Sequence, residues 1–207
     1  MKIAIVTGLP REARIAAGAG LDVACRGPGP DGARQAAGEL AARGADWLVS
    51  FGYAGGLSPD LAAGDLVVPT AVLDQAGRRW TCAGLPGFPM AGLLLGADRV
   101  MASRAEKGGS AGLAAAVDCE SHAVAAVASA RGIGFSVVRV VVDAAGMALP
   151  AASLVAVDRS GRLRPAALLA ALLRRPGDLP GLLRLAAASR SADRTLTVAA
   201  LRLARLG

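Results

Sequence analysis

The chain has 207 residues, a length that fits one large domain more easily than two. Hydrophobic residues make up 54% of it and aromatic residues only 3%, so we expect a core of Ala, Val and Leu and no base-stacking platform for nucleic acid. The net charge is +7, and the three cysteines are far apart with no C-x-x-C pair, which argues against a disulfide framework and a structural zinc site.

Up to Asp74, short apolar runs alternate with helical patterns. Apolar runs that end at Gly or Pro are typical of buried strands, and apolar residues three and four positions apart are typical of helices. The expected elements are a strand at Lys2–Thr7, a helical turn at Arg11–Gly18, a strand at Leu21–Cys25, a helix at Ala33–Gly44, a strand in Asp46–Gly56 that runs into a Gly-rich turn, and one strand in Gly64–Asp74.

The same alternation continues to Asp143 and then gives way to helices alone. Strands that alternate with helices predict an α/β fold, here a three-layer α/β/α arrangement around a central mixed sheet. We expect a single domain over residues 1–207, with a basic helical C-terminal region from about residue 151. The remaining elements are a strand leading into a loop at Met90–Met101, a strand at Leu113–Asp118, a helix at Glu120–Gly132, and a strand at Phe135–Asp143.

The positive charge is concentrated near the C-terminus. From Arg159 onward ten Arg stand against two Asp, a net charge of +8, whereas the first 158 residues carry −1. A basic tail of this kind is either a solvated helix face or a surface attracted to anionic lipid or nucleic acid. Mean hydropathy is +0.47, but the apolar run at residues 165–173 is half of the ~20 residues that a membrane span needs. No signal peptide pattern is found, which predicts a cytoplasmic protein.

A Gly-rich turn follows the second expected strand. Its sequence GPGPDG, Gly27 to Gly32, formally matches G-x-G-x-x-G, the dinucleotide-binding pattern. It does not follow the first strand, however, and Pro28 and Pro30 remove two backbone N–H groups that would face a pyrophosphate. The pattern therefore favours a tight turn near an anion or polar ligand.

Three acidic residues follow expected strands, namely Glu12, Glu120 and Asp143. The carboxyl ends of strands in an open α/β sheet face one crevice, so these carboxylates can converge there. Helix capping and surface solvation are the alternative for each. His122 follows Glu120 by two residues and is expected to face away from it on the helix, without partners for a metal site. Asp118 is expected either to support the site residues from behind or to cap that helix.

Five blocks in this order resemble the purine nucleoside phosphorylase and methylthioadenosine nucleosidase superfamily: IVTGLPREA, RGPG, GYAGGLSPDLAAGDLVV, VDCESHAVAAVA and VVRVVVDAAG. The resemblance covers roughly residues 1–146. The VDCESH block and the tail LLRRPGDLPGLLRLAAASR are similar to the hopanoid-associated phosphorylases, which are assigned to the removal of adenine from adenosylhopane. A nucleoside phosphorylase-like fold and homodimerisation are implied by the resemblance.

The resemblance also implies roles for the carboxylates. Asp143 matches the aspartate that holds and protonates the leaving purine, a proton transfer typically worth about 10²–10⁴-fold in rate. Glu120 matches the glutamate that binds the ribose 2′ and 3′ hydroxyls, and the Met that usually precedes it is Cys119 here. Glu12 matches the glutamate that activates water in the nucleosidases.

Further positions follow from the same resemblance. Ala54 and Gly55 match the stretch that lines the base, and Val100 and Met101 match a pair that covers it, without its usual aromatic residue. The remaining site, for phosphate or water, is implied at Gly8, Arg26 and Gly27.

We therefore predict an enzyme that releases adenine from a purine nucleoside, most specifically the lipid-linked adenosylhopane, in hopanoid side-chain biosynthesis. It needs no cofactor and no metal, although inorganic phosphate is an alternative co-substrate to water. No nucleic-acid partner is expected, and the basic C-terminal region is a candidate for peripheral membrane contact. A methylthioadenosine or adenosylhomocysteine nucleosidase is the alternative activity, and a non-catalytic lipid- or nucleoside-binding protein is the alternative of another class.

Overall fold

The computed structural model describes residues 1–207, and strands alternate with helices through most of the chain. The strands are β1 (Ile3–Thr7), β2 (Asp22–Cys25), β3 (Trp47–Gly56), β4 (Leu66–Val67), β5 (Ala71–Asp74), β6 (Arg79–Thr81), β7 (Leu93–Gly96), β8 (Ala116–Asp118) and β9 (Gly134–Asp143). The helices are α1 (Pro10–Gly18), α2 (Pro30–Ala42), α3 (Arg104–Gly109), α4 (Ser121–Arg131), α5 (Ala151–Leu154), α6 (Pro165–Arg174), the 3₁₀ turn η1 (Pro176–Asp178) and α7 (Leu179–Leu203).

The strands form one mixed sheet, and β3 is its centre. Their order is β2-β1-β3-β8-β7-β5-β6, with β9 beside β3 and β4 beside β9. β3 pairs in parallel with β1 and with β9, while only its last two residues, Gly55 and Gly56, pair with β8, in the antiparallel direction. A bulge between Ala54 and Gly55 shifts the register of β3 against β9 at that end. The carboxyl ends of β1, β3 and β9 therefore lie together.

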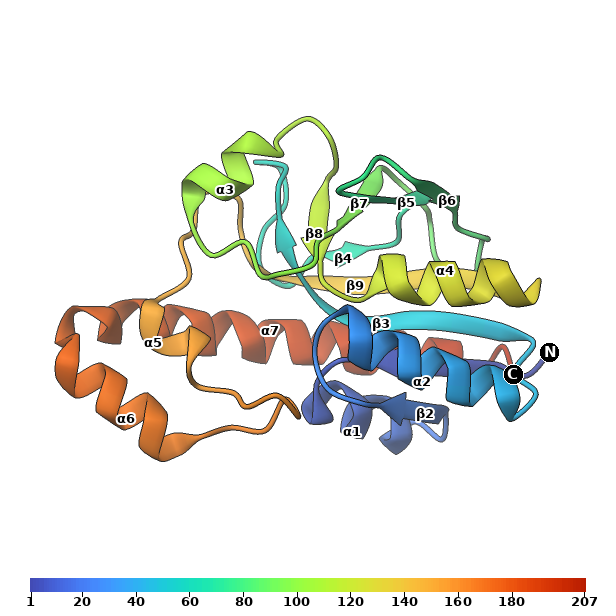
Figure 1. The fold of residues 1–207 in the computed structure, drawn as a ribbon, viewed down its shortest axis with the longest axis horizontal. Coiled ribbons are helices and arrows are strands. Elements are labelled where there is room, and N and C mark those ends of the chain that lie inside the picture. The colour runs from blue at the N-terminus through green and yellow to red at the C-terminus, as the bar shows by residue number, and fades with distance from the viewer.

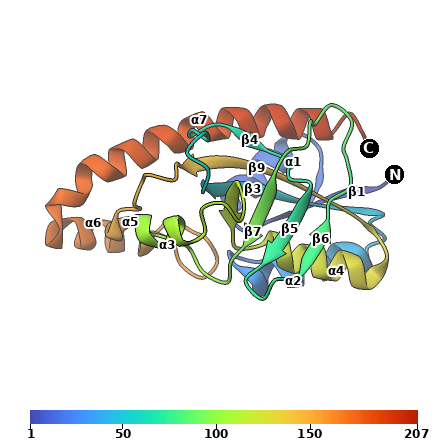
Figure 2. The same ribbon diagram turned by 90° about the horizontal axis from the view of Figure 1, so that it is seen from above.

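Helices cover both faces of the sheet, which completes the three layers. Helices α2 and α4 pack on one face, in an apolar cluster that contains Leu40 and Val124. Helices α1 and α7 pack on the other face, in a cluster that contains Phe51 and Leu196. Figure 2 shows α7 on one side of the strands and α2 and α4 on the opposite side. The predicted α/β/α class with a mixed sheet is confirmed.

Most predicted elements are confirmed, and the departures have local causes. The predicted single strand at Gly64–Asp74 is wrong, because Pro69 lies between two short strands that pair with different partners, β4 with β9 and β5 with β7. The Gly-rich segment 52–56 continues as strand, since its backbone pairs with β9 and β8. Strand β6 and helix α3 were not predicted; both are short, and α3 is stabilised by a capping box between Ser103 and Glu106.

The C-terminal helices are confirmed, and only the end of α7 belongs to the packed body. From Ala192 to Leu203, α7 buries five side chains against the sheet and α1. Before Ala192 the helix buries none, and α6 buries none either. Figure 1 shows α5, α6 and the start of α7 extending beyond the end of the sheet. None of the helices has the length and hydropathy of a membrane span.

The packed end of α7 predicts a stability difference between two of its leucines. Leu196 is fully buried and Leu201 is 50% exposed on the same helix. Leu196→Ala should lower the free energy of unfolding by about 2–5 kcal/mol, because it removes buried methyl groups and leaves a cavity. Leu201→Ala is the control and should change it by less than about 1 kcal/mol. Urea unfolding measures both, and equal losses would contradict the packing of α7.

Candidate active site

An ionic cluster lies at the carboxyl ends of the central strands. It is formed by Glu12 in the first turn of α1, Asp118 at the end of β8, Glu120 at the start of α4, and Arg139 in β9. We call these four residues the Arg139 cluster. All four side chains are buried. The predicted convergence is thus found for Glu12 and Glu120, while Asp143 lies further along β9 with a partner of its own.

Arg139 organises the cluster. Its guanidinium Nη2 lies 2.6 Å from Asp118 Oδ2 and 3.3 Å from Glu120 Oε2, and it donates to Ser50 Oγ at 2.7 Å. Its Nη1 donates to the carbonyl of Tyr53 at 3.2 Å. Burial acts to lower the pKa of Arg139, but the charges of the three carboxylates outweigh it and raise the pKa. The guanidinium is therefore a permanent positive charge between β3, β8 and β9.

Glu12 is held by backbone groups on both of its oxygens. Oε2 accepts from the N–H of Gly8 at 3.1 Å and of Leu9 at 2.8 Å, and Oε1 accepts from the N–H of Tyr53 at 2.9 Å. Burial raises the pKa of Glu12 to about 7, against the opposing charge of Arg139. A carboxyl with that pKa exchanges a proton near neutral pH, which is the requirement for a general base acting on water.

The side chain of Glu120 contacts the Gly-rich turn Gly27–Gly32, whose sequence formally matches the dinucleotide-binding pattern. Its Oε1 accepts from the N–H of Gly29 at 2.8 Å, at the N-terminus of α2, and its Oε2 faces Arg139. Burial raises the pKa of Glu120, and Arg139 opposes that rise. The acceptor at this helix N-terminus is therefore a carboxyl side chain of the protein, where the sequence predicted an anion or a polar ligand. A Cβ at Gly32 would lie 2.2 Å from the carbonyl oxygen of Gly27, so the turn also requires glycine.

Two glycines let backbone approach the carboxylates. A Cβ at Gly52 would lie 2.2 Å from Glu12 Oε1 and 2.8 Å from Arg139 Nη1. A Cβ at Gly8 would lie 2.8 Å from Glu120 Oε1. Real Cβ atoms do not make contacts under 3.0 Å. The site at Gly8 that the resemblance implied is therefore in contact with the Arg139 cluster, and Gly52 belongs to the same site although the sequence did not single it out as a site residue.

Asp143 has a buried lysine as its partner. The Nζ of Lys107, on α3, contacts the Asp143 carboxylate and donates to the carbonyls of Ala144 at 3.0 Å and Met147 at 3.2 Å. Lys107 is only 1% exposed. Burial raises the pKa of Asp143, while the hydrogen bond and charge of Lys107 oppose that rise. Lys107 thus positions the Asp143 carboxylate and opposes the rise of its pKa.

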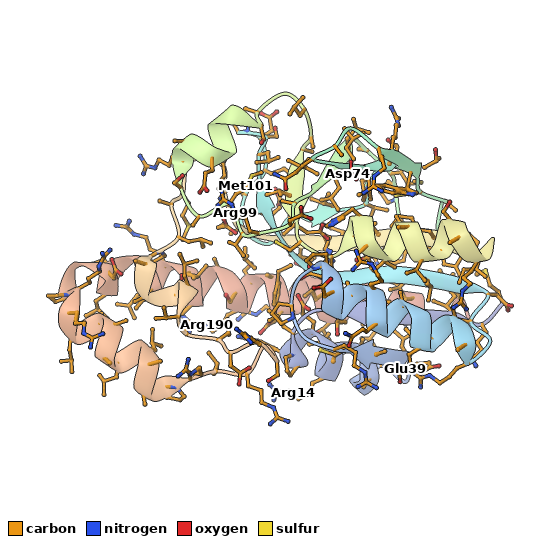
Figure 3. All side chains as sticks on the ribbon, in the orientation of Figure 1. Arg14, Glu39, Asp74, Arg99, Met101 and Arg190 are labelled. Atoms are coloured by element: carbon orange, nitrogen blue, oxygen red, sulfur yellow. The ribbon has the colours of Figure 1, made fainter.

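The residues implied for the base lie around Asp143 to different degrees. A Cβ at Gly55 would lie 3.3 Å from Asp143 Oδ2, so the backbone at Gly55 faces that carboxylate, and Ala54 precedes it buried in the sheet. Val100 is 52% exposed, whereas Met101 is half-buried. Figure 3 shows Met101 on the loop between β7 and α3.

Three other residues singled out in the sequence lie apart from the cluster. Arg26 is exposed, and its guanidinium pairs with Glu39 on α2 at 2.6 Å, so it does not reach the carboxylates. The His122 ring packs against Gly96 and lies 3.3 Å from Asp98, away from Glu120. Asp118 accepts from the N–H of Ser121 at 3.2 Å and so caps α4, as expected, besides pairing with Arg139.

Cys119 and Gly27 are two more positions that the resemblance implied for the site. Burial raises the pKa of the Cys119 thiol, which is half-buried beside Glu120. Gly27 has φ +98°, and a Cβ there would lie 2.5 Å from the carbonyl oxygen of Arg159. The loop that follows α5 therefore packs against the turn after β2. No group of three or more His, Cys, Asp or Glu side chains is placed to hold a metal ion.

The sequence reasoning missed the two cations of the site. Arg139 interrupts a run of Val in a strand that is buried along most of its length, and a charge in such a strand must find a partner. Lysine occurs only at positions 2 and 107, whereas all other basic residues are Arg, so Lys107 stands out by type. Neither signal identifies the carboxylate that each cation meets.

Residues 6–90 match the family described as the Phosphorylase superfamily. Among solved structures, a Campylobacter jejuni 5′-methylthioadenosine/S-adenosylhomocysteine nucleosidase has a TM-score of 0.71 at 16% identity and covers 100% of this chain and 98% of its own. Native futalosine hydrolase of Helicobacter pylori has a TM-score of 0.65 at 16% identity, with 100% and 95% covered. A Colwellia psychrerythraea nucleosidase in complex with adenine has a TM-score of 0.60 at 22% identity, with 70% and 84% covered.

At these identities the likeness to solved structures establishes the fold, which is that of the nucleoside phosphorylases and nucleosidases. The family match covers residues 6–90, and the fold likeness extends over the whole chain. No curated protein matches the chain significantly.

The raised pKa of Glu12 predicts a pH dependence of stability. Between its ordinary value of 4.5 and about 7, the folded protein holds the Glu12 proton and the unfolded chain does not. The contribution of Glu12 to stability therefore falls as the pH rises through this window. From pH 5 to pH 8 the wild type should lose about 3 kcal/mol more than Glu12→Gln, which cannot titrate. Urea unfolding at both pH values measures this, with Glu39→Gln as the control; parallel curves for wild type and Glu12→Gln would contradict it.

Proposed function

We propose that this protein cleaves the N-glycosidic bond of a purine nucleoside, and that its substrate is adenosylhopane in hopanoid side-chain biosynthesis. The observation that carries the cleavage is the Arg139 cluster, in which Glu12 has a pKa of about 7 at the carboxyl ends of the central strands. The choice of adenosylhopane is supported by the resemblance of the VDCESH block and of the C-terminal tail.

In the proposed reaction, Glu12 takes a proton from water while the water oxygen attacks C1′ of the ribose. The bond from C1′ to the purine nitrogen breaks, and its electron pair leaves with the base. Asp143 delivers a proton to the purine, a role that its buried position and raised pKa support. Glu120, an acceptor held by Gly29 and Arg139, holds the ribose hydroxyls.

We propose water and not phosphate as the nucleophile. In the phosphorylases that the sequence resembles, the position of Glu12 is implied to hold a phosphate-binding arginine. Arg26, the cation that could replace it, is engaged by Glu39. Arg139 is shared between Asp118 and Glu120. A phosphate bound beside Arg139 would face the three carboxylates of the Arg139 cluster, which disfavours its binding.

Hydrolysis of methylthioadenosine or adenosylhomocysteine is the second candidate activity. It is favoured by the fold likeness to a nucleosidase described with both substrates in its name. A protein that binds nucleoside or lipid without cleavage is the third candidate, because Cys119 replaces the usual Met and the pair Val100 and Met101 lacks its usual aromatic residue.

We further propose a cytoplasmic homodimer that reaches a lipid-linked nucleoside by peripheral contact with a membrane. The dimer follows from the resemblance. The membrane contact is supported by the net charge of +8 from Arg159 onward.

Adenine release tests the proposed function. The purified protein is incubated with adenosylhopane or with 5′-methylthioadenosine, with and without inorganic phosphate, and free adenine is measured by chromatography. We expect adenine from adenosylhopane at equal rates in both buffers. Release only with phosphate would show phosphorolysis, release only from methylthioadenosine would select the second candidate, and no release from either nucleoside would leave the binding protein.

Asp143→Asn should lower the rate of adenine release by about 10²–10⁴-fold, since the amide supplies no proton to the leaving base. Asp60→Asn, in an exposed loop, is the control and should keep the wild-type rate. An active Asp143→Asn variant would remove Asp143 from the mechanism.

Lys107 should affect the pH profile through Asp143. Lys107→Met removes the charge that opposes the raised pKa of Asp143, so the alkaline limb of the kcat/KM profile should move to higher pH. Lys2→Met, a change of the other lysine, should leave the profile in place. An unchanged limb in Lys107→Met, with the fold verified by circular dichroism, would show that Lys107 has a structural role alone.

A further inference from the structure

Most of the exposed large hydrophobic side chains lie in the C-terminal segment just before the packed end of α7. We call residues 151–191 the arm; it contains α5, α6, η1 and the start of α7. Eight of the 13 large hydrophobic side chains that are exposed in the whole chain lie in the arm. They are Leu154, Val155, Val157, Leu163, Leu169, Leu173, Leu179 and Leu183.

The exposed leucines of the arm follow helical spacing. Leu169 and Leu173 are four residues apart in α6, and they are 58% and 76% exposed. Leu179 and Leu183 have the same spacing at the start of α7, where they are 46% and 62% exposed. Residues four apart share one helix face, so each helix presents an apolar stripe to solvent. Helix α6 has ten residues and buries none, and an isolated helix of this length is marginal in water. A partner that covers its stripe would stabilise it.

The arginines of the arm are unpaired. The arm carries seven Arg and two Asp, a net charge of +5. We call the rest of the chain, residues 1–150 and 192–207, the body. None of the seven arginines of the arm forms an ion pair, whereas seven arginines of the body do. Both Asp side chains are engaged by backbone N–H groups, Asp158 at Ser160 and Arg162 and Asp178 at Ala152. The positive charge of the arm is therefore open to an external anion.

A groove brings two of these arginines together at the base of the arm. It has a volume of about 460 Å³ and lies between residues 148–151 and the start of α7. Its charged lining residues are Arg175, Arg184 and Asp178, and the Asp178 carboxylate is engaged by the N–H of Ala152. A guanidinium is a preferred ligand of phosphate oxygens, so the groove suits a phosphate-bearing headgroup.

The charge decides between the partners that could cover the apolar stripes. In a two-fold dimer through the arm, each copy would bring seven unpaired arginines toward the other, and like charges repel. An anionic bilayer satisfies both features, because acyl chains take up the leucines and headgroups pair with the arginines. Figure 1 shows α6 and the start of α7 extending beyond the end of the sheet, whereas the loop after α5 returns to the turn after β2, so a flat surface can reach these two helices.

We propose that the arm docks on an anionic lipid bilayer, with the α6 and α7 leucines at the boundary between headgroups and acyl chains and the arginines on the lipid phosphates. The proposal deepens the peripheral contact proposed above, and it does not depend on cleavage. Binding is therefore measured without any nucleoside, so that failure of the docking and failure of the enzymatic activity are separate results.

The test is sedimentation of the full chain with vesicles of phosphatidylcholine alone or mixed with phosphatidylglycerol. We expect binding to the anionic vesicles at low salt, weaker binding at high salt and little binding to phosphatidylcholine. Arg174→Gln/Arg175→Gln should weaken binding about 30-fold, because two arginines are removed and each would make the usual contribution of a basic residue near an anionic surface. Leu169→Ser/Leu173→Ser should also weaken it, with an effect that salt does not remove.

Matched variants in the body control for charge and hydrophobicity. Arg79→Gln/Arg131→Gln removes two exposed arginines that form no ion pair, and Leu113→Ser/Leu201→Ser removes two exposed leucines. Both should bind within about twofold of wild type. Equal losses in arm and body variants, or equal binding to both kinds of vesicle, would overturn the proposal. A dimer that dissociates in Leu169→Ser/Leu173→Ser, without vesicle binding by the wild type, would show that a second copy covers the arm.

Discussion

The buried charge of Arg139 is the constraint on which the site depends. A guanidinium in the middle of the sheet is costly to desolvate, and only well-placed anions and acceptors offset that cost. Asp118 and Glu120 supply the charges, and Ser50 and Tyr53 supply neutral acceptors. These partners fix the ends of β8 and β3 relative to β9. The same contacts that stabilise the charge therefore position the carboxylates at one edge of the sheet.

The Arg139 cluster has more negative than positive charges, and this excess supports the proposed chemistry. One guanidinium faces three carboxylates, and burial raises the pKa of both Glu12 and Glu120 against the charge of Arg139. Backbone N–H groups hold both oxygens of Glu12, and its pKa rises to about 7. Asp143 is separated from this cluster and balanced by Lys107. Two carboxyl groups in different environments can therefore serve as base and acid in one reaction.

The body and the arm follow different physical rules. In the body, the central strands β1, β3 and β9 are buried between helices, and the cations near the site are paired. In the arm, leucines are exposed beside unpaired arginines, and such exposed apolar stripes are unfavourable for a monomer in water. Because the proposed substrate is lipid-linked, one chain would combine a buried nucleoside site with a surface suited to the lipid interface.

The sequence by itself determined the fold class, most of the elements and the two carboxylates Glu12 and Glu120, because apolar periodicity and strand ends are local properties of a chain. It also singled out Asp143 and the basic C-terminal region. Only the tertiary structure decided that Arg139 joins Glu120 to Asp118, that Lys107 pairs with Asp143, and that Arg26 points to Glu39. These are contacts between residues 13 to 36 positions apart, and which cation meets which carboxylate depends on strand order, which no local pattern specifies.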